Sequence, residues 1–151
     1  MNGRTAPLEL VIFVGLQAAG KSTYFAAQLA ATHVHVSKDL MKNTRDRDVR
    51  QEREIAAALA AGKSVAVDNT NPTPAVRAPL IALGRQHGAR VIACYFQTSV
   101  KEAVARNRTR EGKARVPDVA IFVTAKKLVP PALEEGFDEV RVIPPLAPLT
   151  A

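Results

Sequence analysis

The sequence contains few of the residues that mark extracellular or membrane-spanning proteins. Its 151 residues include one cysteine, Cys94, and no tryptophan. One cysteine excludes a disulfide framework, and because Cys94 lies in the apolar run 91–96, we expect it to be a small buried hydrophobe. No apolar run approaches the roughly 20 residues that cross a bilayer, and no cationic, apolar segment opens the chain. We therefore expect a cytoplasmic protein with no membrane contact.

Acidic residues are outnumbered, since 21 Lys and Arg residues face 14 Asp and Glu residues, for a net charge of +7. Such a surplus favours polyanionic partners such as nucleic acid, although it also promotes solubility. Five cations and one carboxylate, Glu111, fall within residues 106–115. A solvated face explains any one of these cations equally well. The cations are Arg106, Arg108, Arg110, Lys113 and Arg115.

A glycine-rich loop at residues 15–22 fits the pattern G-x-x-x-x-G-K-[ST]. In this P-loop, backbone N–H groups surround nucleotide phosphates, the lysine reaches the β- and γ-phosphates, and the hydroxyl binds Mg²⁺. The context supports the motif, because an apolar run at 8–14 predicts a strand before it. Residues 23–31 are rich in alanine and predict a helix after it.

Strand and helix patterns alternate through the rest of the chain. We predict strands at 33–36, 64–67, 91–96 and 139–143, and helices at 45–61, 74–86, 100–110 and 116–128. This order predicts an α/β fold, a P-loop NTPase-type three-layer α/β/α sandwich with a five-stranded, mostly parallel sheet. We expect one domain, 1–151, with a basic lid at about 106–116. The predicted inner stripe of helix 45–61 comprises Val49, Glu52, Ile55, Ala56 and Leu59.

Two carboxylates follow predicted strands and therefore lie at the edge of the sheet where ligands bind. Asp39 can act as a general base toward a hydroxyl, or it can cap a helix over 40–43. Asp68 ends its strand as a Walker-B acid does. We expect His33 and His35 to be structural.

These motifs together resemble the kinase domain of the polynucleotide 5′-hydroxyl kinases. The resemblance covers the P-loop, residues 37–39, the Asp-Asn-Thr-Asn-Pro loop at 68–72, the arginine-rich segment 106–110, Val-Pro-Asp at 116–118 and residues 133–137. It implies ATP and Mg²⁺ as cofactors and the 5′-hydroxyl end of a nucleic acid as substrate. No protein partner is indicated.

The resemblance also implies roles for individual residues. Lys21, Asp39 and Arg110 would be catalytic, with Asp39 as the general base, and Ser22 and Asp68 would hold the metal. Lys38 and Lys42 stand where arginine is usual, and because lysine lacks the bidentate fork we expect a looser grip on a phosphodiester. The implied nucleotide-binding residues are Gly15, Gln17, Ala18, Ala19, Gly20, Lys21, Ser22, Thr23, Arg106 and Arg110. The implied substrate-binding residues are Lys38, Lys42, Asp68, Asn69, Thr70, Asn71 and Arg77.

Three functions remain open from the sequence. The first is a kinase for 5′-hydroxyl ends of DNA or RNA, against which the aromatic content of 5% offers little surface for base stacking. The second is a kinase for a nucleoside, sugar or other small alcohol, since a fold transmits chemistry better than substrate. The third is a non-catalytic ATP-binding regulatory module, in which the carboxylate of Asp39 would have no purpose.

Overall fold

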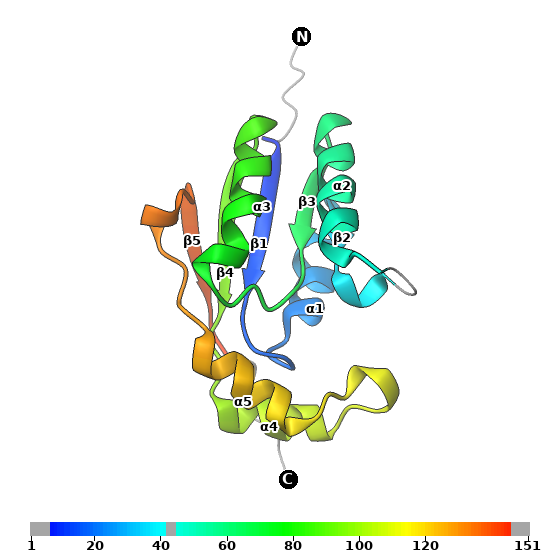
Figure 1. The fold of residues 1–151 in the computed structure, drawn as a ribbon, viewed down its shortest axis with the longest axis vertical. Helices are drawn as coiled ribbons and strands as arrows, with labels where there is room; N and C mark the ends of the chain where they lie inside the picture. Colours follow the sequence, from blue (N-terminus) through cyan, green and yellow to red (C-terminus); the bar gives the residue numbers. More distant parts are fainter. Residues whose placement is uncertain (1–6, 42–44, 146–151) are drawn as a thin grey trace.

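A computed structural model describes residues 7–41 and 45–145, which form a twisted sheet with helices around it (Figure 1). The strands are β1 (Glu9–Val14), β2 (His33–Val36), β3 (Ser64–Val67), β4 (Arg90–Phe96) and β5 (Glu139–Ile143). Their spatial order is β2-β3-β1-β4-β5, and every pairing is parallel. The carboxyl ends of the strands therefore meet at one edge, at the bottom of Figure 1.

The helices begin where polar side chains satisfy their free N–H groups. Asp46, Thr73 and Ser99 accept hydrogen bonds from the first turns of α2 (Arg47–Ala60), α3 (Pro74–Gln86) and α4 (Val100–Arg108). The other helical segments are α1 (Lys21–Tyr24), the π-helical turn η1 (Phe25–Leu29), α5 (Asp118–Lys127) and the 3₁₀ turns η2 (Lys38–Leu40), η3 (Gly112–Ala114) and η4 (Leu133–Glu135). Within the described ranges, no helix is both long and apolar enough to span a bilayer.

Alternate residues of β1 face opposite sides of the sheet, which gives two cores. Leu10 and Ile12 pack with apolar residues of α2 and α3 on one face. Val11 and Phe13 pack with Phe25 and Leu29 of η1 on the other. The predicted three-layer α/β fold is therefore confirmed.

Helices α4 and α5 lie across the carboxyl end of the sheet rather than on either face (Figure 1). They pack on each other through a small apolar cluster that includes Ala103 and Ile121 and is completed by Leu16 from the P-loop. The α4–α5 unit, residues 100–128, therefore stands over the edge where the P-loop lies.

Most predicted bounds agree with the structure to within two residues, and α3, β2, β3 and β5 agree fully. Three expectations are corrected. The first helix is one α-turn followed by a π-turn, and α4 ends at Arg108, so Arg110 lies beyond it. In α2, Gln51 is buried while Val49 is 48% exposed. The Gln51 Oε1 atom accepts a hydrogen bond from Asn69 at 2.6 Å, which explains how a polar side chain tolerates burial.

Candidate active site

The P-loop leaves β1 at Gly15, where no larger residue fits. A Cβ atom on Gly15 would lie 2.9 Å from the Cβ of Phe96 at the end of β4. The Gly15 N–H donates to the Thr70 carbonyl at 3.1 Å, which joins the loop to the segment after β3. The sequence motif thus begins where β1, β3 and β4 converge.

Strained backbone is concentrated in the two loops at this edge. Ala18 has φ 61° and Asn71 has φ 41°, and these are the only non-glycine residues with positive φ among those the structure describes. Gly20, with φ 92°, precedes α1, and no side chain caps that helix. Left-handed residues other than glycine are costly and cluster at ligand-binding loops. Both loops therefore carry backbone strain of the kind found at ligand-binding sites.

Lys21 is buried, with 8% of its surface exposed, and its ammonium group contacts no carboxylate. The Nζ atom donates to the carbonyls of Gly15 and Leu16, at 3.1 and 2.5 Å. Burial lowers the pKa of Lys21 to about 8, and the nearby Asp68 carboxylate partly opposes that shift. Arg110 also lowers this pKa, whereas Asp39 raises it. Four predicted site residues therefore interact electrostatically at one place.

Ser22 and Asp68 meet, as expected for a shared cation site. The Ser22 hydroxyl donates to Asp68 Oδ2 at 2.8 Å. Hard oxygen ligands of this kind suit Mg²⁺, which commonly uses one or two carboxylates and completes its shell with phosphate and water. No group of three or more metal-ligating side chains occurs in the described part of the chain. The pair therefore fits a cation bound together with nucleotide phosphates.

His35 is a member of this cluster that the sequence analysis missed. Its Nε2 atom lies 2.8 Å from Asp68 Oδ2, and its ring stacks on Phe25 with centroids 4.1 Å apart. His33 contacts a different carboxylate, Glu9, at 2.9 Å. The alternation His-Val-His-Val indicated that both rings share one strand face, but one carboxylate comes from β1 and the other from the end of β3. His35 and Ser22 thus contact the same oxygen, Oδ2, of Asp68, and together they restrain the carboxylate.

Asp39 lies in η2, just after β2, and does not cap a helix. Ser37 performs that role, accepting from the Asp39 N–H at 3.3 Å. Asp39 is exposed, and no described residue forms a hydrogen bond or ion pair with its carboxylate. Asp39 thus lies inside a short turn rather than at its N-cap, while residues 42 and 43 of the alternative helix lie outside the described ranges. An unpaired carboxylate within electrostatic range of Lys21 is chemically suited to accept a proton.

The asparagine-rich loop after β3 is held by hydrogen bonds to the protein. Asn69 accepts from the Lys38 N–H at 3.0 Å through Oδ1 and donates to Gln51 through Nδ2. Asn71 is 3% exposed and donates to the Phe13 carbonyl at 2.8 Å. These amides position the loop, and the Thr70 carbonyl is joined to the P-loop as described above.

Arg77 does not reach a substrate, which corrects its predicted role. Its side chain is 0% exposed and forms a bidentate pair with Glu135, at 2.9 and 2.8 Å. Its remaining bonds go to the carbonyls of Asn71 and Val129, at 2.9 and 3.0 Å. Because four of its donors are used and none is exposed, Arg77 joins α3, the loop after β3 and the segment after α5.

The other acceptor-side cations are less informative. The Nζ atom of Lys38 pairs with Asp48 at 2.5 Å at the start of α2. Lys42 lies outside the described residues. Of the two lysines expected to bind an acceptor beside Asp39, Lys38 is therefore paired with Asp48, and the position of Lys42 is not described.

The α4–α5 unit places Arg110 near the P-loop. Arg110 is half-buried and donates only to the Ala114 carbonyl, at 3.3 Å. Arg108 points away and pairs with Asp118 at 3.0 Å, and Arg106 is partly buried in α4. The Gln17 amide joins the P-loop to α5 by donating to Thr124 Oγ1 at 3.0 Å. Gln17 therefore faces α5, with its buried Oε1 atom unpaired among the described residues.

A cavity of about 200 Å³ opens beside the P-loop, on the side away from Asp39. Most of the residues that line the cavity could not be predicted from the sequence, because they come from segments far apart in the chain. Only the P-loop residues and Thr23 carried a motif. The lining includes Ala19, Gly20, Thr23, Tyr24, Phe96 and Ile143.

Comparison with known families identifies the family of this chain. A family model described as an AAA domain matches residues 10–129. The chain belongs to this AAA domain family. The match spans the P-loop, both carboxylates and the α4–α5 unit, and it ends before Glu135 and Ile143.

Among curated proteins, the chain is similar to a bifunctional polynucleotide phosphatase/kinase from Schizosaccharomyces pombe. The two are 29% identical over 140 residues, which cover 90% of this chain and 33% of that protein. The chain thus spans about a third of the length of the curated relative. The similarity confirms the predicted resemblance to polynucleotide kinases and supports a phosphotransferase.

Two solved structures illustrate how widely the fold is shared. A chain of the Pnkp1/Rnl/Hen1 RNA repair complex superposes with a TM-score of 0.69 at 23% identity, over 85% of this chain and 46% of that one. A gluconokinase from Sinorhizobium meliloti 1021 superposes with a TM-score of 0.66 at 18% identity, over 96% and 86%. At these identities the likeness concerns the fold alone.

Proposed function

We propose that the chain is an ATP-dependent kinase that phosphorylates a hydroxyl group, most favourably the 5′-hydroxyl of DNA or RNA. The observation that carries the proposal is the bond between Ser22 and Asp68 beside the P-loop, with Asp39 and Arg110 near enough to act on the charge of Lys21. A nucleotide-binding switch would need the first two but not an unpaired carboxylate at Asp39. The similarity to a polynucleotide phosphatase/kinase supports the same choice.

ATP would bind with its phosphates in the P-loop, where Lys21 would exchange two loop carbonyls for phosphate oxygens. The cavity beside Thr23 and Tyr24 suits the nucleoside of the donor, because its lining is mostly apolar and it adjoins the loop. Ser22 and Asp68 would hold Mg²⁺, which would supply positive charge against the nucleotide phosphates. His35 would keep the Asp68 carboxylate oriented.

In the transfer step, the acceptor oxygen would form a bond to the γ-phosphorus while the bond from that phosphorus to the bridging oxygen breaks. ADP leaves with the bond's electron pair. Asp39 accepts the proton of the acceptor hydroxyl, so the carboxylate becomes a carboxylic acid and the oxygen a better nucleophile. Arg110 and Lys21 would stabilise the charge that develops on the phosphoryl oxygens.

We further propose that the chain acts as one kinase domain and that residues 106–116 close over the donor phosphates. The position of the α4–α5 unit across the sheet edge supports this role. Closure would exclude water, which otherwise competes with the acceptor for the phosphate.

The test is an acceptor assay with labelled ATP across 5′-hydroxyl DNA, 5′-hydroxyl RNA, nucleosides and sugars. We expect transfer to the oligonucleotides and a loss of about 10²- to 10⁴-fold in kcat for Asp39→Asn, the usual contribution of a general base. ADP affinity should not change. The matched control is Glu134→Gln, an exposed carboxylate on η4. Wild-type activity retained in Asp39→Asn would contradict the assignment of the base.

A second candidate, phosphorylation of a small alcohol, is favoured by one observation. Arg77 is buried and Lys38 is paired with Asp48, so neither is available to a phosphodiester beside Asp39. Transfer to a sugar or nucleoside with no transfer to oligonucleotides would select this candidate. Its acceptor KM should also vary little with salt, whereas polynucleotide binding weakens steeply.

A further inference from the structure

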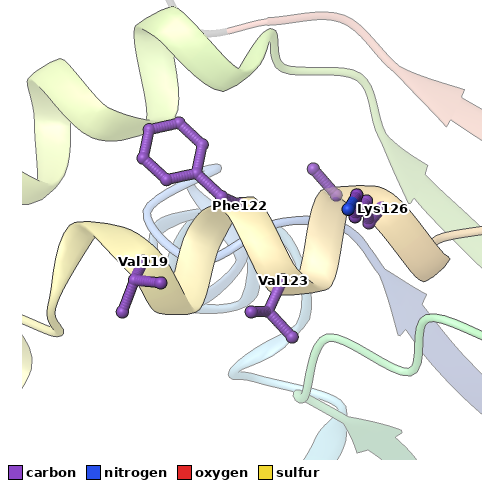
Figure 2. A pocket seen from close by; sticks show the side chains of 5 residues that line it. Val119, Phe122, Val123 and Lys126 are labelled. Atoms are coloured by element: carbon purple, nitrogen blue, oxygen red, sulfur yellow. The ribbon is translucent and has the colours of Figure 1, made fainter.

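We propose that the outer face of α5 binds the strand of a single-stranded polynucleotide acceptor, with Phe122 stacking on a base and Lys126 contacting a phosphate. This inference rests on the proposed kinase function and names the surface that recognises its substrate. The outer face is defined here as Val119, Phe122, Val123 and Lys126 (Figure 2).

The first observation is the exposure of large apolar side chains on this helix. Val119 is 63% exposed, Phe122 50% and Val123 53%. On the inner side of α5, Ile121 packs in the apolar cluster and Thr124 accepts a hydrogen bond from Gln17. Together with Ala125, the residues of the outer face border an open stretch of surface along α5. Contiguous exposed apolar groups of this kind mark binding surfaces.

The second observation is the aromatic residue itself. The chain has seven Phe and Tyr residues, and Phe122 is the only one that is exposed. In Figure 2 its ring projects from one flank of the outer face, and Val119 and Val123 project from the other flank of the same face. An exposed ring flanked by cations is the usual element of single-strand recognition, because every base offers a π-face.

The third observation is where the positive charge lies. Residues 100–129 contain eight cations and three carboxylates, which accounts for a surplus of five of the chain's seven net charges. Lys126 and Lys127 are exposed and form no ion pair with described residues, whereas Asp118 is already paired with Arg108. An apolar face with unpaired cations is complementary to a strand that has bases and phosphates.

The fourth observation is proximity to the chemistry. Gln17 joins the P-loop directly to α5, and the Val129 N–H donates to the Pro72 carbonyl at 2.7 Å, next to the asparagine-rich loop. A strand lying along α5 therefore passes close to the P-loop and the asparagine-rich loop. Since Arg77 and Lys38 are engaged elsewhere, this face supplies unpaired cations that the described residues beside Asp39 do not.

A binding measurement tests the surface without catalysis. In the Asp39→Asn background, the affinity for a fluorescent 5′-hydroxyl single-stranded decamer should fall about tenfold for Phe122→Leu and be kept in Phe122→Trp. Lys126→Gln should reduce the slope of log affinity against log salt by about 0.7. Lys63→Gln, an exposed lysine at the opposite edge of the sheet, is the matched control.

A kinetic measurement separates docking from chemistry. In the otherwise wild-type enzyme, Phe122→Leu should raise the KM for the decamer about tenfold and leave its kcat, and the KM for a nucleoside 3′-phosphate, unchanged. If the wild type phosphorylates no polynucleotide, the proposed function fails, while the binding assay still tests the surface.

The proposal is overturned if wild type fails to bind the decamer or if Phe122→Leu binds it as tightly as wild type does. Sedimentation distinguishes another occupant. Dimerisation that Phe122→Leu abolishes, with decamer affinity unchanged, would assign this face to a second copy of the chain and would also overturn the proposal.

Discussion

The two loops over the active edge use their polar side chains in opposite ways. In the segment after β3, the side chains of Asp68, Asn69 and Asn71 all bond to the protein, and buried Arg77 braces the segment from α3. In the connector between α4 and α5, Lys113 and Arg115 are exposed and form no ion pair with described residues.

This difference suggests two roles: the segment after β3 positions catalytic groups, and the connector between α4 and α5 neutralises charge. Groups bonded on every side hold a geometry before any ligand arrives, and so the segment after β3 can fix a carboxylate to within a fraction of an ångström. Cations without partners can move to phosphates when these appear. The first region should therefore fail through loss of structure when mutated, and the second through loss of rate or affinity.

The largest effect should come from Arg77→Ala. The substitution leaves the nearly buried Glu135 without its partner and removes the hydrogen bonds to the carbonyls of Asn71 and Val129. Breaking a buried ion pair in this way costs about 3–5 kcal/mol of unfolding free energy. Urea denaturation measures this loss. The control, Arg108→Ala, breaks an ion pair whose arginine is 63% exposed and should cost less than about 1 kcal/mol. Equal losses in the two variants would remove the distinction between the two regions.

The next effect should be on turnover in Arg110→Ala. If Arg110 neutralises transferred phosphate charge, its loss should lower kcat about 100-fold, the scale for one preorganised donor. Arg108→Ala should keep nearly full activity, because its guanidinium points to Asp118. Thermal unfolding should be the same in both. A large loss of stability in Arg110→Ala would show that the connector between α4 and α5 also stabilises the fold, which would contradict the comparison.

The smallest effect concerns pH and links the two regions through Lys21. Its pKa of about 8 means that the ammonium is present below pH 8 and is lost above it. ADP affinity should therefore fall by up to about tenfold per pH unit between pH 8 and 9.5, a range in which the phosphates are already ionised. Calorimetric titration of wild type and Lys21→Met checks this, since the variant should bind more weakly and without the slope. A flat wild-type profile would contradict the shifted pKa.

The sequence predicted what depends on local pattern. The P-loop strand was evident from the apolar run ending at Gly15, and α3 from Thr73-Pro74 at its start, because these signals lie within one element. The fold class follows from their alternation. The same holds for Asp39 and Asp68, since parallel strands bring their carboxyl ends together.

What the sequence did not reveal depends on contacts between distant residues. Arg77 and Glu135 are 58 positions apart, and His35 and Asp68 are 33 apart, so no local pattern pairs them. Gln51 is buried only because Asn69 meets it, which a hydrophobic stripe cannot indicate. Composition likewise showed a positive surplus but not that most of it lies in the α4–α5 unit.

The attachment of that unit has a consequence for how the protein can change. Helices α4 and α5 have their own apolar cluster and join the rest through Leu16, Gln17 and Val129, while both main cores are complete without them. Mutations that remodel residues 100–128 therefore need not disturb the sheet. If the outer face of α5 binds the acceptor as proposed, that face can change acceptor preference while Arg110, the P-loop and the sheet stay the same.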